Sequence, residues 1–345
     1  MTRRVTAIGV AVLLALLNPP PTAAQAVTDR VVVVAENVRV FVDGAPVDHV
    51  ALGQVFVVHG VRDGWLWVRH RRSGWIEMRQ VMPLGQDAVD FFTRLIAANP
   101  NSAAPYRARG NIWGHLGKLD FAIDDYDAAI QRDPNHVAAR INRGLAEHHR
   151  GNYDEAIANY DQALRLEASN PILFNNRGWA RHAKGQFEKA IEDYTEAIRL
   201  DAKYVPAYSN RAASYCSRGE HAQALVDFDR VLMLDPYSAT DYDRRAWLRA
   251  TCPDATLRDG QKAVADATRA CRLVDWKNSR YFDTLAAAQA EAGDFRQATT
   301  LLQNAIKLDG GHKTDLRAKL LEGFRDREPF RDGQIKNETQ RGRDR

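Results

Sequence analysis

Apolar and small residues recur with a period of 34 along most of the chain, and within each period they follow helical spacing. Each unit holds two such groups, whose members stand three or four residues apart and therefore share one face of a helix. Two neighbouring columns show the period most clearly: Arg109, Arg143, Arg177, Arg211 and Arg245, followed by Gly110, Gly144, Gly178, Ala212 and Ala246. The pattern predicts pairs of helices that stack on one another in register.

Other columns predict how the two helices of one unit meet. Gly110 and Trp113 lie on one face of the first predicted helix, and Ala122 and Tyr126 lie on one face of the second. We expect these faces to pack together, because Gly110 and Ala122 are small enough for two backbones to approach closely. Gly117 is expected to end the first helix in the left-handed conformation, which glycine adopts without steric cost.

These columns of aromatic, glycine, alanine and tyrosine residues resemble those of tetratricopeptide repeat (TPR) proteins. The resemblance implies a mainly α fold, a TPR α-solenoid built from helix-turn-helix repeats of 34 residues. Ala168 and Ala202 stand where this family has proline, and the turn of the fifth unit is five residues longer than the others. The repeats are expected to begin near Ala103, Val137, Pro171, Val205, Ala239 and Ser279.

Ahead of the repeats, apolar residues occur in short runs at period two, as in strands that are buried on one face. The runs RVVVVA, QVFVVHGV and WLWVRH are separated by Asp-Gly and Ser-Gly turns. With the pair DGWLWV and SGWIEM, this segment resembles a bacterial SH3-like domain. The resemblance implies a small β-barrel with peptides or cell-wall fragments as ligands. Trp65, Trp67 and Trp75 are expected on its ligand surface, with a place in its core as the alternative.

The shifts between these patterns predict the domain organisation. The Phe92 and Leu95 segment matches only the second helix of a repeat, so it is expected to cap the first one. Leu316, Leu320 and Leu321 share one face of a polar helix that is expected to cover the last repeat. The expected parts are a signal peptide at 1–26, the SH3-like β-barrel at 27–84, a capping half-repeat at 85–102, six TPR-like repeats at 103–310, a capping helix at 311–332 and a disordered tail at 333–345.

The N-terminus has the order of a secretory leader. Arg3 and Arg4 precede an apolar run from Val5 to Leu17, which is followed by a proline cluster and small residues. A helix that spans a membrane needs about 20 apolar residues, so this run favours a cleaved signal peptide. Cleavage is expected after Ala26, with a cut after Ala24 as the alternative, and the protein is expected to be periplasmic or secreted.

Charge and cysteine content narrow the choice of partners. Removal of the leader leaves 46 basic and 44 acidic residues, which alternate along the chain, so we expect no nucleic-acid partner. Cys216, Cys252 and Cys271 are too few for a disulfide scaffold and allow at most one bridge. Cys216 with Cys252 is the favoured pair, and three free thiols are the alternative.

The resemblance also implies where a ligand would bind. The inner face of the first helices in TPR proteins forms a concave groove, and a peptide is the expected ligand. Asn142, Asn176 and Asn210 recur at one level and are expected to bond with a peptide backbone, although simple solvation of the helices would also account for them. The implied groove residues are Arg107, Asn111, Asn142, Asn175, Asn176, Trp179, Asn210, Asp243, Arg244 and Trp247.

Two other sets of polar residues have structural explanations. The arginine column is matched by Asp125, Asp193 and Asp227 on the second helices, which predicts ion pairs between helices rather than a cationic track. Histidines near the ends of first helices are favoured by the helix dipole, and neighbouring repeats do not readily bring them to one metal ion. These histidines are His115, His148, His149 and His182.

The sequence therefore predicts an exported, non-catalytic protein–protein interaction scaffold that binds a partner's peptide segment in the TPR groove, with no cofactor and no metal. One alternative is a cell-wall protein that binds peptidoglycan through the SH3-like domain and uses the repeats as a spacer. Another is a regulatory partner of a separate enzyme.

Overall fold

The computed structural model describes residues 30–69, 73–312 and 314–332. The expected signal peptide, both of its cleavage points and the expected tail lie outside these residues. The chain divides into two compact units, which we call unit 1 (Met1–Leu166) and unit 2 (Glu167–Arg345). The division falls between the second and third repeats, so the N-terminal strands belong to the same unit as the first two repeats.

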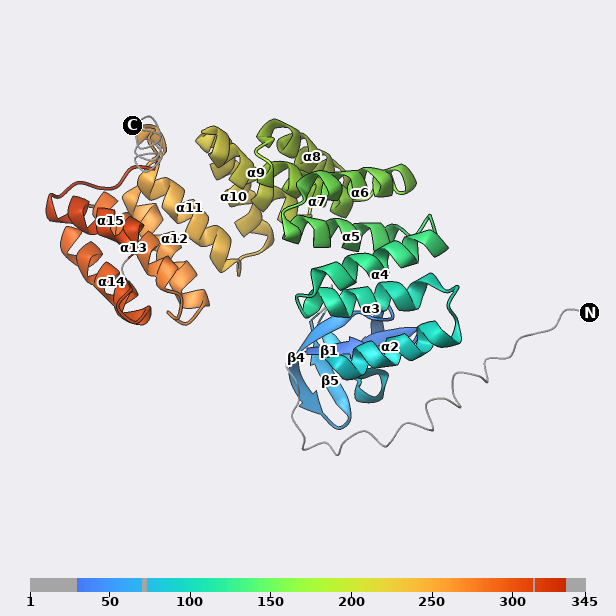
Figure 1. The fold of residues 1–345 in the computed structure, drawn as a ribbon. Helices are drawn as coiled ribbons and strands as arrows, with labels where there is room; N and C mark the ends of the chain where they lie inside the picture. The colour runs from blue at the N-terminus through green and yellow to red at the C-terminus, as the bar shows by residue number, and fades with distance from the viewer. Residues whose placement is uncertain (1–29, 70–72, 313, 333–345) are drawn as a thin grey trace, which may run out of the picture. The chain divides into compact units, whose positions relative to one another are not determined.

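The N-terminal β-module, residues 30–83, is a sheet of seven antiparallel strands in the order β3-β2-β6-β5-β4-β1-β7 (Figure 1). Alternate residues point to a shared core, which includes Val38, Val40, Leu66, Val68 and Ile76. The period-two pattern of the sequence therefore predicted these strands correctly. The strands are β1 (Arg30–Val33), β2 (Val38–Val42), β3 (Ala45–Val50), β4 (Val55–Arg62), β5 (Trp65–Val68), β6 (Gly74–Glu77) and β7 (Val81–Pro83).

The rest of the described chain forms 14 α-helices, numbered α2 to α15, and within each unit they stack as an α-solenoid. Six of them begin at the residues where the sequence places the start of a repeat. The helices of unit 1 are α2 (Gln86–Ala98), α3 (Ala103–His115), α4 (Leu119–Arg132), α5 (Val137–Arg150) and α6 (Tyr153–Leu166). Those of unit 2 are α7 (Pro171–Ala183), α8 (Phe187–Leu200), α9 (Val205–Arg218), α10 (His221–Leu234), α11 (Ala239–Thr251), α12 (Gly260–Leu273), α13 (Ser279–Glu291), α14 (Phe295–Leu308) and α15 (Asp315–Arg325).

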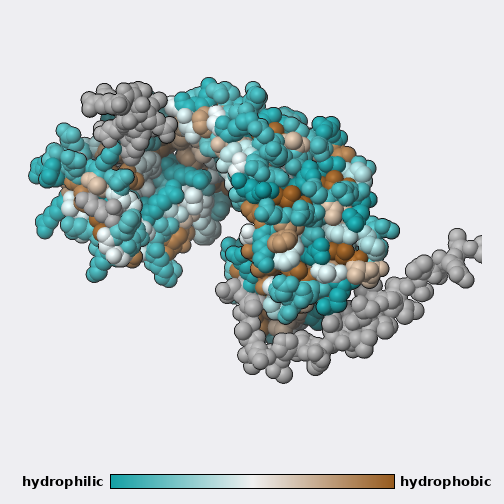
Figure 2. All heavy atoms as spheres, in the orientation of Figure 1, coloured by the Kyte–Doolittle hydropathy of each residue, from teal (hydrophilic) through white to brown (hydrophobic). Residues whose placement is uncertain are grey.

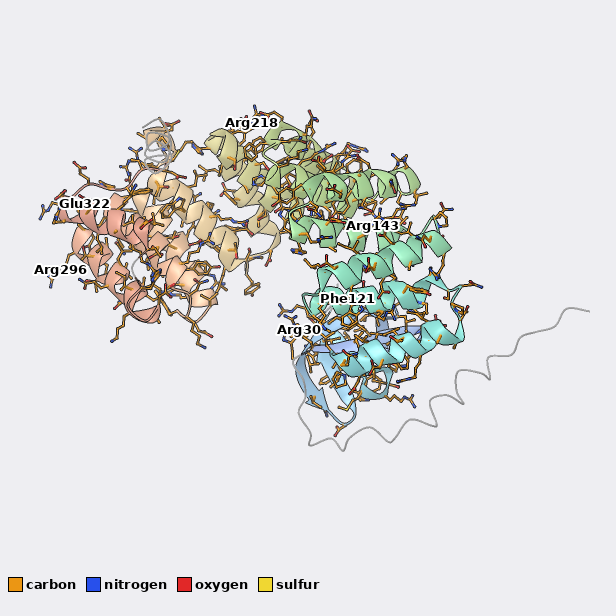
Figure 3. All side chains as sticks on the ribbon, in the orientation of Figure 1. Arg30, Phe121, Arg143, Arg218, Arg296 and Glu322 are labelled. Atoms are coloured by element: carbon orange, nitrogen blue, oxygen red, sulfur yellow. The ribbon has the colours of Figure 1, made fainter. Side chains whose placement is uncertain are left out.

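Small residues bring the two helices of a repeat together as the sequence predicted. A β-carbon on Gly110 would lie 2.7 Å from Cε1 of Tyr126, on the second helix of the same repeat. Gly117, which ends the first helix, has a φ of 74° and so adopts the expected left-handed conformation. Trp113 is half-buried between the helices, where its ring lies 5.3 Å from that of Phe121, labelled in Figure 3.

Ion pairs join the two helices of the first, third and fourth repeats, which confirms the predicted arginine-to-aspartate contacts. Each of Arg109, Arg177 and Arg211 pairs with its expected aspartate through two guanidinium nitrogens. The second repeat differs, because Arg143 (Figure 3) donates to Asn159 of α6 at 2.6 Å, and its ion pair is with Asp127 of α4, in the preceding repeat. Such bidentate contacts fix the relative height of the helices.

The extra residues of the fifth repeat form an ordered turn between α11 and α12, which contains the short 3₁₀ helix η2 (Ala255–Leu257). Arg258 ties this turn down by donating from Nη1 to the carbonyl oxygen of Cys252 at 2.9 Å. Its Nε donates at 2.9 Å to Glu291, at the end of α13. The insertion therefore connects the first helices of the fifth and sixth repeats.

The last helix covers the sixth repeat as expected. Leu320 is fully buried there, and Leu316 and Leu321 pack beside it. Arg317 is only 2% exposed and donates from Nε to Asp283 at 2.7 Å, which keeps its charge paired.

Hydrophilic residues cover most of the face of each unit that Figure 2 presents, and hydrophobic residues form small separate patches on it. None of the described helices is both long and apolar enough to span a membrane.

Candidate peptide-binding surface

The inner face of the first repeat is covered by the β-module, so it is not the open groove that the sequence predicted. Arg107 is only 9% exposed, and its Nη2 donates to the carbonyl oxygen of Leu52 at 2.9 Å. Burial lowers the pKa of this guanidinium. Leu52 lies in the turn between β3 and β4, which rests on α3.

The same turn presses closely against the helix. Gly53 has a φ of 75°, and a β-carbon on it would lie 2.3 Å from that of Ala108. Asn111 lies beside this contact, and whichever way its amide is turned, one of its polar atoms is 3.0 Å from the hydroxyl of Tyr126. These contacts position the β-module on the helix at which a ligand was expected.

The asparagines of unit 1 contact each other. Nδ2 of Asn142 donates to Asn111 at 2.7 Å, so one amide uses its donor on its neighbour in the next repeat. A pocket of about 410 Å³ remains between the β-module and the first two repeats. Its lining includes Gln54, Asn111, His115, Asn142 and His149. Burial, followed by the charge of Arg30, lowers the pKa of His115.

The asparagines of unit 2 are also bonded to one another. Nδ2 of Asn210 donates to Oδ1 of Asn175 at 3.0 Å, and Asn175 donates to Asn176 at 3.3 Å. Asn175 and Asn176 are both buried, and Trp179 is half-buried. The asparagines therefore contact one another within each unit, but in other pairs than the three residues expected at one level, and these amides use part of their hydrogen-bonding capacity inside the chain.

A pocket of about 340 Å³ opens on the inner side of the fourth to sixth repeats. Trp247 and Leu248 of α11 provide apolar walls, and Asp243, Arg244 and Arg280 add charge. Arg244 is held by Ser209, to which its Nη1 donates at 2.9 Å. Of the groove residues that the resemblance implied, Asp243, Arg244 and Trp247 meet at this pocket.

Asp243 is the most unusual group in this pocket. Its side chain is 3% exposed, and its Oδ1 has no hydrogen-bond partner among the described residues. Burial raises its pKa to about 6, although a hydrogen bond from Thr284 and the charges of Arg280 and Arg244 act in the opposite direction. A ligand that offers an N–H or O–H group would satisfy this oxygen.

Trp247 is in contact with the end of the described chain. The ring of Phe330 lies 5.8 Å from that of Trp247, and Phe330 is only 7% exposed. Phe330 was not predicted as a site residue, because it lies beyond the repeats and belongs to no periodic column.

The predicted tryptophans of the β-module lie on the outer face of its sheet. Trp65, Trp67 and Trp75 alternate along β5 and β6 with the residues of the core, and each is half-buried. Trp67 and Trp75 are paired across the strands with their rings 5.1 Å apart, and Phe41 packs edge-on to Trp65. The four rings form an aromatic surface that points away from the core.

The histidines and cysteines have separate surroundings. Nδ1 of His182 lies 2.8 Å from the hydroxyl of Ser214, and within the described residues no three metal-binding side chains cluster around one point.

Cys216 and Cys252 belong to one apolar cluster, and all three cysteines are free thiols. The bridge favoured from the sequence is therefore not formed. Burial raises the pKa of the Cys216 thiol to about 12.

Comparison with known protein families matches residues 85–136 and 114–171 to a family described as tetratricopeptide repeat, and residues 178–216 to one described as TPR repeat. The matched residues are tetratricopeptide repeats. This confirms the resemblance and the mainly α, solenoid fold class predicted from the sequence. For the β-module, the seven antiparallel strands agree with a separate small β domain.

Two solved structures show the same TPR fold. The APC/C hetero-tetramer Cut9-Hcn1 matches with a TM-score of 0.57 and 16% identity over 70% of this chain, which spans 46% of the length of the other. The C-terminal part of a TPR repeat-containing protein from Cytophaga hutchinsonii matches with a TM-score of 0.52 and 22% identity, covering 69% of this chain and 93% of the other. No curated protein matches the chain.

Proposed function

We propose that this protein is an exported, non-catalytic scaffold whose TPR repeats bind a segment of a partner protein in the pocket of unit 2. The TPR fold is consistent with a protein–protein interaction scaffold. The leader-like order of residues 1–26 supports export. The raised pKa of Cys216 argues only against this thiol as a nucleophile at neutral pH.

The observation that carries the proposal is the unsatisfied oxygen of Asp243 beside Trp247. An aromatic wall next to buried polar groups is typical of surfaces that anchor a partner side chain. A peptide supplies amide N–H groups for Asp243 and carbonyl oxygens for Arg244.

The proposal is tested by placing a photoreactive amino acid at position 280, which is exposed at the pocket, in the full chain produced in its native compartment. A crosslinked partner is expected, and its yield should fall when Trp247 is replaced by alanine. The matched control carries the same group at Met233, which is exposed on α10 and does not line the pocket. Equal yields of crosslinked partner from both positions, or a yield that Trp247→Ala leaves unchanged, would count against the proposal.

The outer aromatic surface of the β-module favours a second candidate function. Three tryptophans and Phe41 on one face of a sheet resemble a platform for a ligand that stacks on rings. Cell-wall glycan or peptide would be such a ligand, with the repeats as a spacer. Binding of the full chain to purified sacculi should then be lost in Trp67→Ala and retained in Trp247→Ala, whereas the reverse result would exclude this candidate.

A further inference from the structure

The chain that follows α15 returns to the inner side of unit 2. Figure 1 shows it leaving α15 and running back to the end of α11. There the backbone N–H of Asp332 donates to the carbonyl oxygen of Thr251 at 2.8 Å. Residues 328–331 form no helix or strand, and Pro329 restricts the backbone directly before Phe330. The segment Phe330–Asp332 therefore lies on the repeats in the manner of a bound peptide.

Two side chains of this segment enter sites that are complementary to them. Phe330 packs against Trp247 and is buried with the apolar residues of the fifth and sixth repeats. Arg331 reaches Glu291, with 2.8 Å between Nη1 and Oε2. The other carboxylate oxygen of Glu291 is bonded to Arg258 of the insertion, which holds the carboxylate in place for the guanidinium of the segment.

The segment stops short of one group that a ligand would satisfy. Asp332 lines the edge of the pocket that contains Asp243, yet Oδ1 of Asp243 still has no partner among the described residues. A buried acceptor without a donor is unfavourable, so a longer or differently placed peptide has one more hydrogen bond to make than the segment does. This difference gives a partner an advantage over the resident segment.

We infer that the inner face of the fifth and sixth repeats selects a peptide in which an aromatic residue is followed directly by arginine, and that Phe330–Asp332 occupy this site until a partner segment of the same chemistry displaces them. The inference rests on the proposed function and specifies its ligand. Because few residues connect α15 to Phe330, the local concentration of the segment is high, on the order of millimolar, and it competes with any partner.

The probe is a dye-labelled peptide with the sequence Glu-Pro-Phe-Arg-Asp, which is that of residues 328–332. Its affinity for the full chain is measured by fluorescence anisotropy. The double variant Phe330→Ser/Arg331→Ser is expected to bind the probe about tenfold more tightly than the wild type, because the competing segment is lost. Adding Trp247→Ala to the double variant should remove most of this gain, and a probe with serine in place of phenylalanine should bind to neither protein.

A single substitution at a partly exposed residue controls for misfolding of the double variant. Arg331 is partly exposed, so Arg331→Glu should release the segment through repulsion from Glu291 and raise probe affinity in the same direction. Equal binding of the probe to wild-type and both released variants would overturn the inference. Dimerisation of the wild type that disappears in the double variant would also overturn it, because the segment would then belong to the site of a second copy.

The two proposals fail separately. If the probe does not bind while crosslinking from position 280 still depends on Trp247, the partner has another chemistry and only the present inference is wrong. If the probe binds as expected but no crosslink depends on Trp247, the site is an internal one and the scaffold function is wrong.

Discussion

Gly178 lies against the ring of Tyr194, so closely that a β-carbon on residue 178 would be 2.8 Å from Cε1 of that tyrosine. The same pairing of glycine with tyrosine occurs in the first two repeats. In the fourth repeat alanine faces Phe228, and in the sixth Ala286 and Leu302 stand at the corresponding positions. The first helix thus carries glycine where its neighbour on the second helix is tyrosine, and alanine where that neighbour is phenylalanine or leucine.

This relationship predicts the effect of Gly178→Ala. The added methyl group should destabilise unit 2 by about 1–3 kcal/mol, partly offset by the better helix propensity of alanine. Combining it with Tyr194→Leu recreates the pair of the sixth repeat, so the double variant should be at least ~1 kcal/mol more stable than the sum of the single effects implies. Urea unfolding of the four proteins measures this coupling. Strict additivity would show that the two positions do not compete for the same space.

The ion pair between Arg211 and Asp227 predicts a difference between breaking and replacing a buried contact. Asp227→Ala leaves the guanidinium without its partner and should cost about 3–5 kcal/mol of stability. The apolar pair Arg211→Met/Asp227→Leu should cost much less, since neither charge remains. The control is the exposed pair Arg199 and Glu196, where Glu196→Ala should have no measurable effect on thermal unfolding. If the apolar pair were as unstable as Asp227→Ala, the bidentate contact itself would be essential.

The contact between the β-module and α3 is tested by two glycines with similar backbones. Gly53→Ala places a methyl group against Ala108, whereas Gly44, with a φ of 77°, has open space around its β-carbon position. Both substitutions introduce the strain of a side chain at positive φ. The further loss of about 1–3 kcal/mol in the free energy of unfolding that we expect for Gly53→Ala therefore measures the contact with Ala108. Hydrogen exchange along α3 should also become faster in that variant alone. Identical behaviour of the two variants would mean that the turn does not press on the helix in solution.

Asp243 predicts a specific dependence of stability on pH. Its pKa is raised to about 6 in the folded chain from a usual value of 3.8, so the folded state holds the proton more tightly than the unfolded state. Stability should therefore fall as the pH rises from about 4 to about 6 and then level off. Asp243→Asn lacks this penalty and should be more stable than the wild type at neutral pH by on the order of 2 kcal/mol, with the advantage shrinking towards pH 4. An advantage that is independent of pH would contradict the assignment.

The sequence predicted the features that depend on short spacings. The arginine and glycine columns repeat every 34 residues, and the contacts they make lie within one repeat. For example, Arg109 and Asp125 are only 16 residues apart. Asp266, the partner of Arg245, escaped prediction because the insertion moves it five positions beyond the period. Allowing for that shift would have identified it.

The site was predicted less well, because the contacts that define it join distant parts of the chain. Arg107 and Asn111 have the right positions for a groove, but the turn at Leu52 covers them, and Arg107 and Leu52 are 55 residues apart. Phe330 likewise meets Trp247 from outside the repeats. Neither the turn at Leu52 nor the segment at Phe330 belongs to the 34-residue period. The sequence therefore did not indicate which part of the inner face stays accessible.

The carboxylate of Glu291 links two segments that are far apart in the sequence. One of its oxygens binds Arg258, which the lengthened turn supplies, and the other binds Arg331, which follows the last helix. The two arginines depend on the same anion although they are 73 positions apart in the sequence. Among relatives, a shortened fifth turn and the loss of a basic residue after the last helix should therefore be inherited together.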